Sequence, residues 1–352
     1  MPGNNMRRSA ALPCLLAVLV ASLARAQPST TPRLVIWITP WGDSFDPGGF
    51  PEHAVPGVVV AYDADCGLCT STLRQWLETS LDLIRAFRSE GREVFVNLFC
   101  EKYVPSWRWR GHLEEVVLPG EVIGELARAI GEGHGVYVGF SELTSCVNSP
   151  GCREKLVELY GVLRAAFPGA KLYYYGSGGD DVEALKDLKA RAHLDLVGLD
   201  IWEYRWTPQG VTAGEQLVSK LKALALSAGW SSVIVGEVGF RVDDAEAYVE
   251  PWNWSRRRVF DEGADARYYY QVLTDLLHEK GARPAYVGVW SWNDGVFAVK
   301  DEEDALRAIV SALAAKPAEN GIPRLIPAIL LAAAVLVPLL PLLRARRLMR
   351  LA

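Results

Sequence analysis

Eight short apolar runs alternate with longer amphipathic stretches along this chain, and this alternation constrains its fold more than any other feature. The runs are rich in Val, Ile and Tyr, and most are apolar throughout rather than at every second residue. Strands of a parallel sheet that are buried on both faces have this pattern. The eight runs cover residues 33–39, 57–62, 93–99, 135–140, 171–175, 194–201, 232–237 and 285–290.

The segments between most of these runs carry apolar residues three and four positions apart, which predicts helices with one face packed on a sheet. They cover residues 73–89, 120–131, 154–167, 182–192, 214–228, 266–281 and 304–315. Eight strands alternating with helices predict an α/β fold, the (β/α)8 or TIM barrel, over residues 27–315. An open doubly wound sheet is the alternative, but residues 40–43 do not form the phosphate-binding glycine loop that it would need after the first strand.

Both ends of the chain have the pattern of targeting segments. Residues 1–26 combine two arginines, an apolar run and a final Ala-Arg-Ala, which is typical of a secretory signal peptide. Residues 325–343 are uncharged and long enough to predict a single transmembrane helix, joined to the barrel by a linker at 316–324. The basic tail at 344–352 is expected in the cytoplasm. We therefore expect a barrel outside the cell, anchored in the lipid bilayer of the cell membrane.

Charge is distributed unevenly along the chain. The 352 residues carry a formal net charge of −5, but the two ends hold seven arginines and no acid, so that residues 27–343 carry −12. An acidic barrel is not expected to bind nucleic acid, which requires a basic face.

The chain has only 12 Asn and Gln residues, and this scarcity of thermolabile amides suggests a hot habitat.

The cysteines suit an oxidising compartment. Cys146 and Cys152 bracket one loop after the fourth strand, which predicts a disulfide. Cys100 ends the third strand beside the loop that holds Cys66 and Cys69, and either of those two could pair with it. A zinc site built from the three is the alternative, but the second Cys-x-x-Cys that such a site usually has is missing. We expect no metal and no cofactor.

Acidic and aromatic residues gather where the predicted strands end, which is where TIM barrels place their sites. Glu142 follows the fourth strand and Glu237 ends the seventh, and a carboxylate at the end of an apolar strand is costly unless it is paired or used. Nine of the 12 tryptophans also lie at or after strand ends, where indole rings suit stacking on sugars. The expected substrate-binding residues are Trp41, Asp43, Asn97, Ser141, Asp200, Trp202, Tyr204, Trp290, Trp292 and Asn293.

Two segments resemble a known family. Residues 236–240 read Gly-Glu-Val-Gly-Phe and residues 289–294 read Val-Trp-Ser-Trp-Asn-Asp. They are similar to the nucleophile segment and the eighth-strand segment of retaining glycoside hydrolases with (β/α)8 barrels, in particular β-mannanase-like and endoglycanase-like members. The resemblance implies an acid/base Glu after strand four, here Glu142, and a nucleophilic Glu after strand seven, here Glu237. It also implies a raised pKa for Glu142 and a Trp at 290 beneath the reacting sugar.

The resemblance implies an O-glycosyl hydrolase that cleaves a β-linked glycan with retention, since two carboxyls about 5–5.5 Å apart support double displacement. The chain departs from the family at three points. Ser141 stands where members often have Asn, no Arg ends the second strand, and Trp202 stands where members commonly have Tyr, a role that Tyr204 could take. A non-catalytic glycan-binding barrel at the cell surface is therefore an alternative. Another is a metal-dependent barrel enzyme that uses Asp200.

Overall fold

The computed structural model describes residues 32–42, 46–63, 67–100, 116–202, 204–207, 210–239, 247–248, 257–258, 262–294 and 298–299. The chain divides into two compact units, Met1–Ala314 and Ala315–Ala352, and all described residues belong to the first. The predicted signal peptide, linker, transmembrane helix, basic tail and the helix over 304–315 lie outside the described residues. Within those residues, no helix has the length and apolar character needed to cross a membrane.

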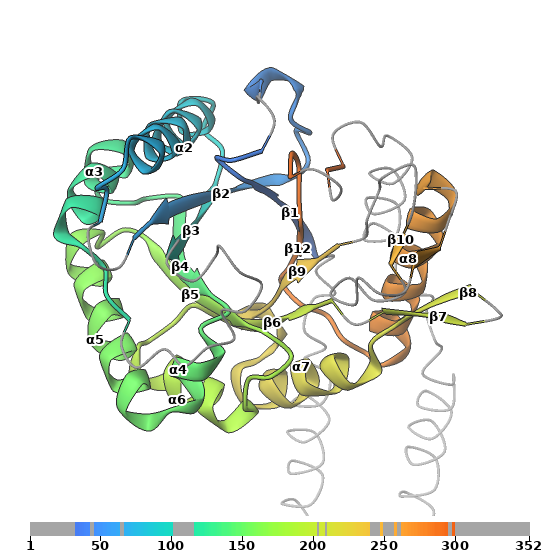
Figure 1. Cartoon of the computed structure of the whole chain (residues 1–352). Helices are drawn as coiled ribbons and strands as arrows, with labels where there is room; N and C mark the ends of the chain where they lie inside the picture. Colours follow the sequence, from blue (N-terminus) through green and yellow to red (C-terminus); the bar gives the residue numbers. More distant parts are fainter. Residues whose placement is uncertain are drawn as a thin grey trace, which may run out of the picture. The chain divides into compact units, whose positions relative to one another are not determined.

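Eight parallel strands close into a barrel, which confirms the predicted fold (Figure 1). They are paired in the circular order β1-β12-β9-β6-β5-β4-β3-β2, each neighbour parallel to the next. Each strand falls within about two residues of its predicted range. The bounds are β1 Arg33–Ile38, β2 Val55–Tyr62, β3 Val94–Cys100, β4 Val136–Ser141, β5 Lys171–Gly176, β6 Leu196–Ile201, β9 Val233–Val238 and β12 Tyr286–Val289.

Helices surround the barrel and connect its strands (Figure 1). Six of the predicted helices are confirmed as α2 Ser71–Ser89, α3 Gly120–Ile130, α5 Pro150–Ala166, α6 Val182–Arg191, α7 Glu215–Ala228 and α8 Glu262–Glu279. Local sequence sets several of their ends. Thr70 caps α2 through its side chain, and Asp181 caps α6 in the same way, as short polar residues do at helix starts. Gly131 ends α3 with a positive φ.

Several short elements have no counterpart in the sequence prediction. A hairpin of β7 (Tyr204–Thr207) and β8 (Gly210–Ala213) separates β6 from α7, and β10 (Ala247–Tyr248) pairs with β11 (Arg257–Arg258). A short helix, α4 (Thr144–Asn148), stands between β4 and α5, and the 3-10 turn η1 (Pro47–Gly49) lies between β1 and β2. A second 3-10 turn, η3 (Trp230–Ser232), precedes β9.

The strands are apolar throughout because each one contributes to two cores. In β1, Leu34, Ile36 and Ile38 belong to the outer core, between the barrel and its helices. Val35 and Trp37, in the alternate positions, belong to the inner core, inside the barrel. The inner core contains many aromatic rings, and its members are Val35, Trp37, Val55, Phe95, Tyr137, Tyr173, Tyr175, Leu196, Ile234 and Tyr286.

Glycines in the strands make room for these rings. A Cβ at Gly57 would lie 2.4 Å from the ring of Trp37, and a Cβ at Gly236 would lie 2.0 Å from the ring of Tyr175. Real Cβ atoms do not approach other atoms so closely, so neither position accepts a larger residue without movement of the ring. The Trp37 indole donates a hydrogen bond to the Gly236 carbonyl (2.8 Å), which satisfies its one buried polar group.

Candidate functional site

Glu142 is held at the end of β4 by its backbone. Its N–H donates to the Tyr175 carbonyl (2.8 Å), which continues the pairing of β4 with β5 beyond the strand. Its φ of 52° is in the left-handed region, which residues other than glycine seldom adopt. The side chain is partly exposed. A strained, partly exposed carboxyl at the carboxyl end of a barrel strand is typical of a functional position.

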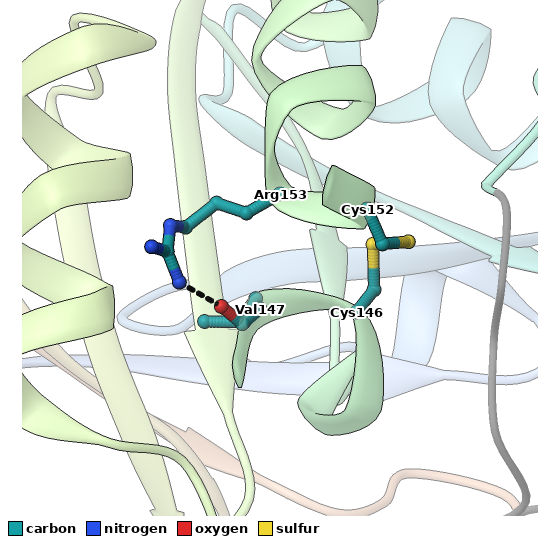
Figure 2. Close-up of a disulfide and its surroundings, with 4 residues drawn as sticks. All are labelled: Cys146, Val147, Cys152 and Arg153. Carbon is teal, nitrogen blue, oxygen red and sulfur yellow. Dashed lines mark hydrogen bonds between the residues drawn. A yellow bond between two sulfur atoms is a disulfide. The ribbon is translucent and has the colours of Figure 1, made fainter. Parts of the chain in front are cut away.

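The segment after Glu142 is fastened by a disulfide and an arginine. Cys146 in α4 and Cys152 in α5 form the predicted disulfide, with Cα atoms 4.9 Å apart (Figure 2). The Arg153 guanidinium donates to the Val147 carbonyl, and its Nε donates to Asp187 of α6 (2.9 Å). These contacts tie the turn after Glu142 to two helices. Cys69 is also disulfide-bonded, whereas Cys66 and the side chain of Cys100 lie outside the described parts.

Glu237 lies near the end of β9 and is 7% exposed. The Tyr175 hydroxyl donates to its Oε1 (2.6 Å), and the Trp202 indole donates to its Oε2 (3.1 Å). Burial and, after it, the negative charge of Glu142 raise the pKa of Glu237 to about 8, although the hydrogen bonds from Tyr175 and Trp202 lower it. The two predicted catalytic carboxyls are therefore close enough to affect each other's charge.

Two glycines near Glu237 leave room for the aromatic rings that donate hydrogen bonds to it. A Cβ at Gly236 would lie 2.0 Å from Tyr175 Cγ, and a Cβ at Gly239 would lie 2.3 Å from Trp202 Cη2. Each glycine thus leaves room for one of the two rings that donate to the carboxylate. The Gly-Glu-Val-Gly pattern is a packing requirement of this hydrogen-bonded arrangement.

Asp200 brings a third carboxyl into the cluster. It lies on β6, is 4% exposed and shares a hydrogen bond with Glu142. Burial raises its pKa well above the ordinary value, and the charges of Glu142 and Glu237 add to this effect. A hydrogen bond between two carboxyls requires a proton on one of them, because an ionised carboxylate can only accept. Asp200, predicted to bind substrate, thus lies against the predicted acid/base.

Asn97 and Ser141 lie beneath this cluster and bond to each other and to Tyr175. The Asn97 Nδ2 donates to the Ser141 Oγ (3.0 Å) and to the Tyr175 hydroxyl (3.0 Å). Both residues are buried, at 1% and 6% exposed. They connect β3, β4 and β5 directly under the carboxyls. Sequence reasoning assigned them to substrate binding and did not include Tyr175, which in a run of three tyrosines resembles an ordinary core residue.

Two partly exposed tryptophans flank the carboxyl cluster from β1 and β12. The rings of Trp41 and Trp290 have centroids 6.4 Å apart, and the Trp290 indole donates to Asp294 (2.9 Å). Asp294 also accepts a hydrogen bond from Trp41, and burial raises its pKa. Asp294 therefore fixes both indoles through their N–H groups.

Two of the predicted substrate-binding residues, Trp292 and Asn293, are buried. Trp292 is 7% exposed, and its ring lies 5.3 Å from that of Phe50 in the outer core. Asn293 is 1% exposed and bridges to β1, since it accepts from the Thr39 N–H (2.9 Å) and donates to the Thr39 carbonyl (3.0 Å). The remaining candidates, Asp43 and the side chain of Tyr204, lie outside the described parts.

A groove of about 820 Å³ is lined by residues of α4, α7 and the start of α6, and its lining includes Asn148, Lys220 and Asp180. Asp180 is fully buried after β5, and the Thr144 hydroxyl donates to it (3.2 Å). Burial raises its pKa to about 7, and the charge of Glu142 contributes in the same direction. Among the residues that the structure describes, no group of three or more His, Cys, Asp or Glu side chains could hold a metal ion.

Comparisons with known proteins give matches only among solved structures. No protein-family model matches the chain, and no curated protein does. Active domain 2 of a chitinase from Pyrococcus furiosus is 12% identical with a TM-score of 0.47, covering 83% of this chain and 99% of its own. A family 5 xyloglucanase from Paenibacillus pabuli is 12% identical with a TM-score of 0.48, covering 78% and 92%. A group IV chitinase from Ostrinia furnacalis is 12% identical with a TM-score of 0.48, covering 80% and 100%.

Proposed function

We propose that this protein is a glycoside hydrolase that cleaves a β-linked glycan with retention. One observation carries the proposal: two carboxyls, Glu142 and Glu237, stand at the carboxyl ends of barrel strands and influence each other's ionisation. One is partly exposed and the other is buried against neutral hydrogen-bond donors. Double displacement at an anomeric carbon needs two carboxyls, one as acid/base and one as nucleophile.

Glu237 is the proposed nucleophile. Its carboxylate attacks the anomeric carbon to form a glycosyl ester, while Glu142 gives its proton to the departing glycosidic oxygen. In the second step Glu142 takes a proton from water, and the water oxygen displaces Glu237 from the sugar. The pair must hold one proton in total at the start. Repulsion between the two charges, together with burial, keeps a proton in the cluster at a pH at which isolated carboxyls are ionised.

The tryptophans support a carbohydrate substrate. Trp41 and Trp290 present partly exposed indole rings beside the carboxyls, and such rings can stack on the C–H faces of sugars. Asp294 fixes both of them before any ligand arrives. In this proposal Trp290 lies beneath the sugar whose bond is broken.

Hydrolysis of a glycan panel by the wild type and three variants tests the function. E142Q and E237A should each lower kcat by on the order of 10²–10⁴. E158Q, which changes an exposed glutamate on α5, should leave kcat unchanged. The product formed first by the wild type should keep the β anomeric configuration, as followed by NMR.

Wild-type rates in both E142Q and E237A would refute the assignment of the two residues. An inverted product would refute retention. Binding of a glycan with no turnover by the wild type would favour the alternative, a non-catalytic glycan-binding barrel.

We further propose that the barrel is exported and anchored in the cell membrane through the segment at 325–343. The disulfide between Cys146 and Cys152 supports an oxidising compartment, since such bonds are rare in the cytosol of most organisms. The apolar, uncharged composition of 325–343 supports the anchor.

A further inference from the structure

Several acidic groups lie close together around Glu237, and their charges affect whether Glu237 is ionised. Four acidic groups surround Glu237 or lie within electrostatic reach of it: Glu142 after β4, Tyr175 on β5, Asp200 on β6 and Asp294 after β12. Each of the carboxyls carries negative charge when ionised and so opposes the ionisation of Glu237. Both hydrogen bonds that Glu237 accepts from described residues come from neutral groups, the hydroxyl of Tyr175 and the indole of Trp202.

We propose that Tyr175 is a positioning residue that holds Glu237 in the orientation of a nucleophile and favours its ionised form, through a chain of hydrogen bonds that starts at Asn97. This inference rests on the proposed function. In this inference the neutral hydroxyl of Tyr175, on the fifth barrel strand, stabilises the Glu237 carboxylate. The second strand of this chain ends without an arginine that could do so.

The chain of hydrogen bonds has a fixed direction. The Tyr175 hydroxyl has one proton, and it gives that proton to Glu237 Oε1 at 2.6 Å. The same oxygen accepts from the Asn97 amide at 3.0 Å, so the amide occupies acceptor capacity of the hydroxyl while its one proton goes to Glu237. The second Asn97 amide proton goes to Ser141, which fixes the amide in turn (3.0 Å). The order is therefore Asn97 to Tyr175 to Glu237.

Packing leaves Tyr175 no other position. Its side chain is fully buried in the inner core, and its ring stacks on that of Tyr173, with centroids 6.2 Å apart. Gly236, directly before Glu237, is the residue whose missing Cβ makes room for the ring. The ring of Tyr175 packs against Gly236, the residue next to Glu237, so packing fixes the hydroxyl relative to the carboxylate. The hydrogen bond is therefore preorganised for the ionised form of Glu237. It does not have to form during the reaction.

Substitution Y175F removes the proton donated to Glu237 and, with the same oxygen, the acceptor of the Asn97 amide. Without the donated proton the ionised form of Glu237 is less stable, so Glu237 should take up a proton at higher pH. A hydrogen bond to a charged group has a strength that corresponds to about one pH unit or more. We expect NMR titration of the Glu237 carboxyl carbon, assigned by its loss in E237Q, to move upward by at least about one pH unit in Y175F. The acid limb of kcat/KM should move by the same amount, with kcat recovering at higher pH.

Y173F is the matched control. It removes a buried tyrosine hydroxyl from the same face of the same strand, but that hydroxyl donates to the Val96 carbonyl and does not touch Glu237. Y173F should change stability without moving the titration of Glu237. N97A provides a second test if Y175F does not fold, because it removes the donor to the Tyr175 hydroxyl. N97A should move the titration in the same direction as Y175F and by less.

Two results would overturn the inference. One is a Glu237 titration in Y175F that coincides with that of the wild type. The other is a shift in Y173F as large as that in Y175F, which would make the effect one of general packing. The NMR titration reads the charge of Glu237 without turnover. If no glycan is hydrolysed, the proposed function therefore fails separately from the inference about Tyr175.

Discussion

At the scale of single residues, Glu237 combines deep burial with hydrogen bonds from neutral groups, and this determines how it affects stability. Its pKa of about 8 in the folded protein lies above the ordinary value of 4.5. Between these two values the folded protein holds a proton that the unfolded chain has released. The contribution of Glu237 to stability is therefore fully present below about pH 4.5 and is lost as the pH rises towards about 8.

Substitution E237Q removes this titration and keeps the size of the side chain. We expect the free energy of unfolding of E237Q, relative to the wild type, to rise by more than about 1 kcal/mol from the low end of that pH range to the high end. Urea unfolding of both proteins across the range measures the difference. A difference that stays constant with pH would mean that Glu237 has the same proton affinity in the folded and unfolded states.

Individual site residues differ in how clearly the sequence marks them. Glu142 and Glu237 could be chosen as candidates because a carboxylate at the end of an apolar strand stands out in a sequence. Trp292 and Asn293 share the strand-end position with Trp290, and only the fold shows that they pack on Phe50 and bond to Thr39. Tyr175 was missed because its hydroxyl acquires a partner only when β5 and β9 come together inside the barrel.

At the scale of elements, the disulfide and the Arg153 contacts that connect α4 and α5 support the turn after Glu142. The disulfide between Cys146 and Cys152 closes a short loop, with a sequence separation of six residues. In the chain-entropy model such a loop contributes about 2 kcal/mol to the free energy of unfolding. The double substitution C146S/C152S should therefore lower the unfolding free energy by about that amount in urea titrations.

A reducing agent gives the matched control for this prediction. It breaks the Cys69 disulfide in both proteins, so it should destabilise the wild type by about 2 kcal/mol more than it destabilises the double variant. If the double variant has the same unfolding free energy as the oxidised wild type, the disulfide does not contribute measurably, and the contacts of Arg153 suffice to connect α4 and α5.

The barrel strands were predictable to within about two residues because burial on both faces makes each one a continuous apolar run between turn residues. The β7–β8 hairpin was not predictable from the sequence. Its strands are four residues each and form a sheet separate from the barrel, and runs this short give a weak sequence signal. Residues Thr144–Asn148 likewise make a single short helix whose ends have no side-chain cap, and so leave no start signal.

At the scale of the whole molecule, the proposed export and anchoring can be tested on the full chain. Residues 325–343 should keep the protein in the membrane fraction after an alkaline carbonate wash, while the barrel is digested by a protease added to intact cells. A variant that stops at residue 324 should be released into the medium. Recovery of the full chain in the soluble fraction would contradict the anchor.

The aromatic interior has a consequence for how such sequences can change over time. Trp37 occupies the space that a side chain at 57 would need, and Tyr175 does the same at 236. A larger residue at either of these glycines is compatible with the barrel only if the facing ring shrinks in the same lineage. In a family of homologues these positions should covary across strands, and the pair formed by Tyr175 and Gly236 should persist wherever the Glu237 carboxylate does.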